Sequence, residues 1–209
     1  MKLRLVFAYM WVVASVLAVA CHYAWGIPYL RQDRFWDDIK VAAELEEAAM
    51  EAMTVEALAE AENAYSDIIE RFDDRDPSSL QAQVVLARAR CTLYKGELVP
   101  AMLDLEDQLD NCVRMGVPQD VHRDVRETLA RCLFGIAWLM RHEGASQENW
   151  MEVADKARQH FRYLTEVARN EEERERCAKN LHVAIRLEQI DSTHPWLCLL
   201  YTSPSPRDH

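Results

Sequence analysis

The sequence predicts an all-α fold. The chain is rich in the helix formers Ala, Leu, Glu and Arg, and it holds only 5 glycines and 7 prolines among 209 residues. Apolar residues recur along the body in steps of three and four, as they do on one side of a helix. No stretch alternates with a period of two, so we predict no strands.

Seven body helices follow from this periodicity. The second, for example, carries the apolar stripe Val55, Leu58, Ala61, Tyr65 and Ile68. The expected helices span residues 33–53, 54–72, 78–94, 98–112, 118–142, 147–168 and 171–190. Their breaks have suitable chemistry, with an N-cap expected from Asp76–Ser79 and helix ends at Gly96, Gly116 and Gly144.

The fifth predicted helix differs from the others because Cys132–Met140 is apolar without a break. A helix that is apolar all round must be covered on every side or must present one side for binding. We therefore expect either a central helix that touches neighbours on three faces or a helix with an exposed binding face.

The N-terminal segment, residues 1–30, is predicted to be a signal anchor or transmembrane helix. Residues 5–25 are almost entirely apolar, and a helix of that length spans about 31 Å, which matches a hydrocarbon core of about 30 Å. The very short basic N-terminus favours a single-pass protein of a bacterial-type membrane with its body outside the cytoplasm.

Two alternatives use the same segment. Ala18-Val19-Ala20 fits a signal-peptidase site, which would give a secreted protein after cleavage behind Ala20. Ala18–Cys21 also resembles a bacterial lipobox, in which Cys21 would carry the lipid. Its resemblance is imperfect, because Leu is usual where Ala18 stands.

The charge balance bears on partners. The formal net charge is −11, and such a chain repels the phosphate backbone. We expect no binding of nucleic acid.

Parts of the body resemble tetratricopeptide repeats. In Leu86–Leu109, small Ala89 lies near the end of one helix, Gly96 at the turn, and Ala101 in the next helix. Ala59–Pro77 resembles the second helix of a preceding repeat, and Trp150–Ala168 resembles a third. The period is irregular, because Ala61, Ala101 and Ala157 are 40 and 56 residues apart where the family has about 34.

This resemblance implies that residues 31–197 form a right-handed stack of antiparallel helical hairpins whose concave face holds a protein or peptide partner. The residues aligned with the family's concave-face positions are Leu86, Arg90 and Leu93 in the third predicted helix, with Gln83, and Arg131, Phe134, Trp138 and Arg141 in the fifth. Arginines beside aromatic side chains suit an extended, partly acidic peptide.

Four cysteines lie on the apolar stripes of the body: Cys91, Cys112, Cys132 and Cys177. Core packing is the expected role of such cysteines. A second hypothesis pairs Cys91 with Cys132 in a disulfide, since both should lie at equal height on adjacent hairpins.

No motif indicates catalysis. The sequence has no Walker loop, no G-x-S-x-G, no G-x-G-x-x-G and no metal-binding spacing of His and Cys. We therefore expect no enzymatic activity, no cofactor and no metal.

Residues 198–209 resemble translated sequencing-adaptor DNA. Cys198–Asp208 reads CLLYTSPSPRD, and each codon fits the transposase mosaic end and its adaptor. We exclude this tail from the fold and expect the natural protein to continue past Leu197.

The leading functional hypothesis is a membrane-anchored helical-repeat protein that acts as an interaction module or scaffold. One alternative makes the repeats the N-terminal arm of a longer enzyme or receptor. Another is an exported lipoprotein that assists assembly of the cell envelope, by analogy of architecture.

Overall fold

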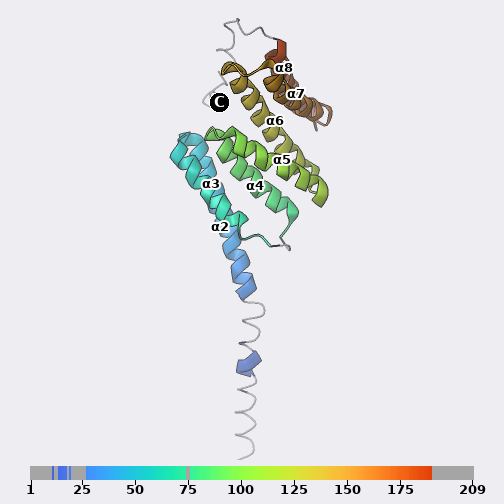
Figure 1. Cartoon of the computed structure of the whole chain (residues 1–209). Coiled ribbons are helices and arrows are strands. Elements are labelled where there is room, and N and C mark those ends of the chain that lie inside the picture. The colour runs from blue at the N-terminus through green and yellow to red at the C-terminus, as the bar shows by residue number, and fades with distance from the viewer. Residues whose placement is uncertain (1–10, 12–13, 18, 20–26, 74–75, 190–209) are drawn as a thin grey trace, which may run out of the picture. The chain divides into compact units, whose positions relative to one another are not determined.

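The computed structural model describes residues 27–73 and 76–189, and in addition residues 11, 14–17 and 19. Over these residues the protein is all-helical, as the sequence predicts, and has no strand. Seven helices, α2 to α8, follow one another in the described body (Figure 1). The chain divides into two compact units, Met1–Lys95 and Gly96–His209.

Over its described residues 27–73 and 76–95, the first unit holds α2 (Ile27–Ala52), α3 (Val55–Ile69) and α4 (Ser78–Tyr94). Helix α3 packs against both α2 and α4. Ala42, Ala49 and Ala61 are fully buried where these helices meet. Alanine lets helix backbones approach closely, and the larger Leu58 and Ile68 then fill the remaining space.

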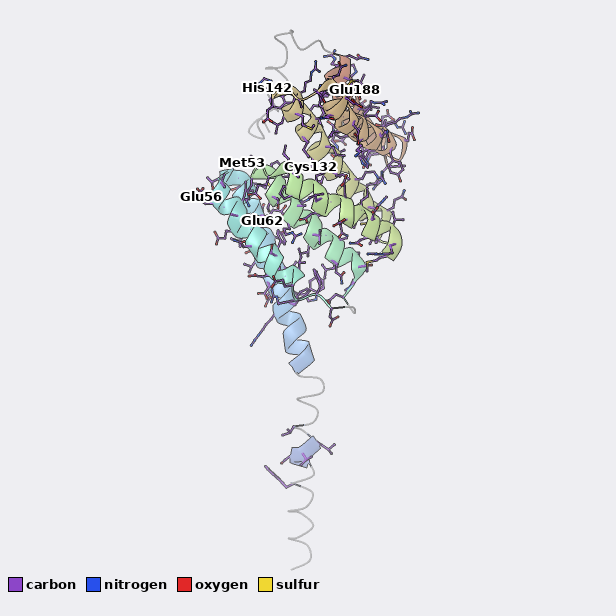
Figure 2. All side chains as sticks on the ribbon, viewed as in Figure 1. Met53, Glu56, Glu62, Cys132, His142 and Glu188 are labelled. Carbon is purple, nitrogen blue, oxygen red and sulfur yellow. The ribbon has the colours of Figure 1, made fainter. Side chains whose placement is uncertain are left out.

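The turn between α2 and α3 is tight. Met53 has φ +50°, a left-handed conformation that is rare outside glycine. The next residue, Thr54, is the N-cap of α3, and its hydroxyl oxygen accepts from the Ala57 N–H at 3.3 Å. The side chain of Met53 is exposed beside Glu56 at this end of the unit (Figure 2).

The start of α4 differs from the expected side-chain cap. Pro77 occupies the N-cap position, and no side chain caps the helix. The carboxylate of Asp76 accepts instead from the backbone N–H of Asp73, at 2.8 Å. The predicted cap from Asp76–Ser79 is wrong because Asp76 closes the preceding turn rather than the helix.

The second unit holds α5 (Leu98–Met115), α6 (Gln119–His142), α7 (Gln147–Glu166) and α8 (Glu171–Gln189). Each helix packs on the next, which gives a run of hairpins. Gly116 ends α5 in the left-handed conformation, with φ +64°. Gly144 turns the chain between α6 and α7 in the same way, with φ +80°.

Helix α6 is the central helix of this unit. It packs along α5 on one side and along α7 on another, and its long side chains also reach α8, as in the ion pair between Glu127 and Arg176. Val125, Leu129 and Leu133 are buried at steps of four residues. In the apolar run Cys132–Met140, Cys132, Leu133 and Ala137 are buried, whereas Phe134 and Trp138 are half-buried and Leu139 is exposed. The run thus shares features of both expected arrangements.

The predicted membrane helix, residues 5–25, lies mostly outside the described residues, as do Cys21 and the tail 198–209. In the part of the chain that the structure describes, no helix is both long enough and apolar enough to cross a bilayer. Trp11 and residues 14–17 and 19 are helical, and the side chains of Trp11, Val16, Leu17 and Val19 are exposed.

The left-handed Met53 gives a test of the fold. Met53→Gly should raise the free energy of unfolding by about 0.5–1 kcal/mol, because relief of the left-handed strain exceeds the extra entropy of the unfolded chain. Urea unfolding would measure the change. Met53→Ala keeps the strain and should give no gain, whereas a glycine variant less stable than the wild type would contradict the geometry of this turn.

Candidate functional site

The residues expected to bind a partner come from two helices in different units. Leu86, Arg90 and Leu93 lie on α4 of the first unit. Arg131, Phe134, Trp138 and Arg141 lie on α6 of the second unit.

Arg90 is held inside the first unit. Its Nε and Nη2 donate to Glu46 Oε1 of α2 at 2.9 and 2.8 Å. Tyr65 of α3 donates its hydroxyl to the other oxygen of Glu46 at 2.7 Å. One carboxylate thus joins three helices, and this pairing assigns Arg90 a structural role.

The two leucines of the α4 set add little exposed surface. Leu86 is buried and Leu93 is half-buried. Of the three predicted positions on α4, the leucines are covered and Arg90 is engaged by Glu46, so we place the candidate site on α6.

Four residues of α6 share one side of the helix, and we call them the α6 face: Arg131, Phe134, Trp138 and Arg141. Their spacing of three, four and three residues places them in one row. Arg131 is exposed, whereas Phe134 and Trp138 are half-buried against a core cluster of Ala137, Trp150, Ala154 and Leu187. Both aromatic rings therefore pack on this cluster, and each residue keeps part of its surface exposed.

The charge on the α6 face is positive. Arg131 Nη2 donates to Glu127 Oε1 at 2.6 Å, and Arg176 of α8 donates to the same oxygen. Two guanidinium groups share one carboxylate, which leaves a surplus of positive charge. This surplus stands out in a chain whose formal net charge is −11.

Arg141 joins the end of α6 to its neighbours. Its guanidinium lies 4.8 Å from the centre of the Trp150 ring of α7 and donates to the Leu187 carbonyl in the last turn of α8. Carbonyls at a helix end lack partners within the helix, so an arginine there is stabilising.

Trp138 stacks on His142, one turn further along α6. The ring centres are 5.1 Å apart and the planes differ by 10°. His142 is exposed at the end of the helix (Figure 2). The pair extends the aromatic surface of the α6 face beyond the four predicted residues.

The four body cysteines are buried free thiols. Burial raises the pKa of both Cys91 and Cys132 to about 12, so neither is a thiolate at neutral pH. Cys91 packs in the core of the first unit, and Cys132 donates to the Leu98 carbonyl at 3.6 Å in the second. A disulfide between these two stays a prediction.

Sequence reasoning missed three residues that shape the α6 face. The Glu127 carboxylate could have been found four residues before Arg131, at ion-pair spacing. Arg176 could not have been found in this way, because its helix, α8, begins 40 residues after Arg131 in the chain. The only local indication for His142 was its aromatic ring, four residues after Trp138 and so on the same side of the helix.

Among the described residues, no group of three or more His, Cys, Asp or Glu side chains is placed to hold a metal ion. Comparison with known proteins finds no matching family model and no matching curated protein. The geometry of the site is therefore the basis of the functional proposal.

The two paired arginines give a test of these assignments. Arg90→Ala should lower the free energy of unfolding by about 1–2 kcal/mol, because it leaves Glu46 half-buried without its cation. Arg131→Ala should change it by less than about 0.5 kcal/mol, since Glu127 keeps Arg176 as its partner when Arg131 is removed. Urea unfolding of both variants would check this, and equal losses would contradict the separation of structural and surface arginines.

Proposed function

We propose that this protein is a membrane-anchored interaction module that binds an acidic segment of another protein at the α6 face and does not catalyse a reaction. The observation that carries the proposal is the sharing of Glu127 by Arg131 and Arg176, on the same helix as Trp138. A carboxylate from a partner would give the surplus guanidinium its own acceptor.

The chemistry of the face defines the partner. Guanidinium groups bind carboxylates through paired, charge-assisted hydrogen bonds. Trp138 and Phe134 add apolar surface of the kind that dominates binding energy at protein interfaces. An extended peptide that carries Asp or Glu next to a large apolar residue fits both features.

The architecture of the body supports a tetratricopeptide-like stack, which is part of the proposal. The helices pack in consecutive hairpins within each unit. The alanines that resemble the family's small packing residues, Ala61, Ala89, Ala101 and Ala157, are all fully buried. Repeats of this kind commonly display helix faces to extended partner segments.

The membrane anchor remains a proposal based on residues 5–25. It is supported by the exposed apolar side chains Trp11, Val16, Leu17 and Val19, which would lie in lipid. In this arrangement the protein spans a bacterial-type membrane once, with the body outside the cytoplasm.

A displayed peptide library, panned against the full-length protein in detergent, would test the proposed function. We expect the recovered peptides to be acidic with a large apolar residue. Arg131→Glu and Trp138→Ala should each weaken their binding by about tenfold or more.

Arg162→Glu is the matched control. Arg162 pairs with Glu166 on the exposed side of α7 at 3.2 Å, so its reversal creates the same like-charge pair as Arg131→Glu does with Glu127. The control should bind within about twofold of wild type. Unchanged binding by the Arg131 and Trp138 variants, with unfolding curves like that of the control, would refute the α6 face as the site.

A further inference from the structure

Arg126 of α6 is a partly buried cation without an acidic partner. Its Nη1 lies 3.1 Å from His160 Nδ1 of α7, and its guanidinium carbon lies 4.4 Å from the centre of the Tyr163 ring. No ion pair joins Arg126 to a carboxylate among the described residues. It therefore sits between α6 and α7 with an imidazole and an aromatic ring as its neighbours.

Two other arginines of α6 have acidic partners. Arg123 lies 4.0 Å from a Glu173 carboxylate oxygen, and Arg131 pairs with Glu127. A guanidinium withdrawn from water without a counter-charge is costly. Consistent with this, burial lowers the pKa of Arg126.

The groups around Arg126 include unused polar atoms. Nε of Arg126 and Nε2 of His122, one turn earlier on α6, are buried and have no hydrogen-bond partner among the described residues. The side chains of His122, Arg126 and His160 are each partly buried as a whole, whereas the two unpaired nitrogen atoms are themselves covered.

The imidazoles are neutral at physiological pH and can serve as donors. Burial and the nearby Arg126 charge lower the pKa of His122 and bring that of His160 to about 4. Because Arg126 Nη1 donates to His160 Nδ1, the hydrogen of that ring is on Nε2. An anion bound here would likewise select the tautomer of His122 with hydrogen on Nε2.

We propose that His122, Arg126 and His160 form a binding site for a small oxyanion of the phosphate class. The anion would supply the missing negative charge and accept from the Arg126 Nε–H and from the imidazole N–H groups. Donors from three side chains on two helices suit a tetrahedral anion with several acceptor oxygens better than a planar carboxylate. The site is separate from the α6 face and does not depend on its function.

Titration calorimetry of the full-length protein in detergent with inorganic phosphate, at constant ionic strength set by chloride, would test the site. We expect saturable binding of phosphate and a matching rise of Tm. Arg126→Gln should weaken the binding by about tenfold or more, and His160→Gln by several-fold. Arg162→Gln, on the exposed side of α7, should leave it unchanged.

Arg126→Met keeps the proposal testable if Arg126→Gln folds poorly. Without phosphate it should be at least as stable as the wild type, because it removes a charge without a counter-charge, and its Tm should not respond to phosphate. The proposal would be overturned by absence of saturable phosphate binding, by equal binding of acetate, or by a phosphate response that persists in both Arg126 variants.

Discussion

A helix that packs along two neighbours and reaches a third has little surface left for its charged side chains, and this constraint on α6 shapes the second unit. Most of its apolar residues are buried where α6 packs against its neighbours, chiefly α5 and α7. The charged residues must therefore lie along the seams between helices or on the remaining strip. The position of each arginine along and around α6 determines which groups it contacts.

The arginines of α6 consequently have different roles. Arg141 completes hydrogen bonding at the end of α8, which secures the last helix. Arg131 lies on the open strip and shares its carboxylate, which suits it to a partner that brings another. Arg126 lies between α6 and α7 against His160 and Tyr163, and within the part of the chain that the structure describes it forms no ion pair. In the proposed account, one helix supplies a structural tie, a protein-binding face and an anion site from the same residue type.

Sequence patterns predicted the local features of this molecule well. The apolar stripes located the body helices, and Gly116 and Gly144 marked turns because a left-handed backbone favours glycine. The resemblance to tetratricopeptide repeats also singled out Arg131 and Trp138, which lie in one row of α6.

Features that depend on distant residues were not predictable. Arg90 was expected to face a partner, yet it pairs with Glu46 from a helix two elements earlier. The environment of Arg126 likewise depends on His160, which no local pattern links to it. In both cases the arginine was visible in the sequence, whereas the side chains around it are set by tertiary packing.

The central claim, that neighbouring arginines of one helix serve different ligands, is tested most directly by NMR of the arginine Nε–Hε groups. In labelled full-length protein, phosphate should shift the resonance of Arg126 and leave that of Arg131 in place. An acidic peptide recovered by panning should shift Arg131 and leave Arg126, and neither ligand should move Arg90. The account would be contradicted if both ligands moved the same resonance, or if neither moved any arginine of α6.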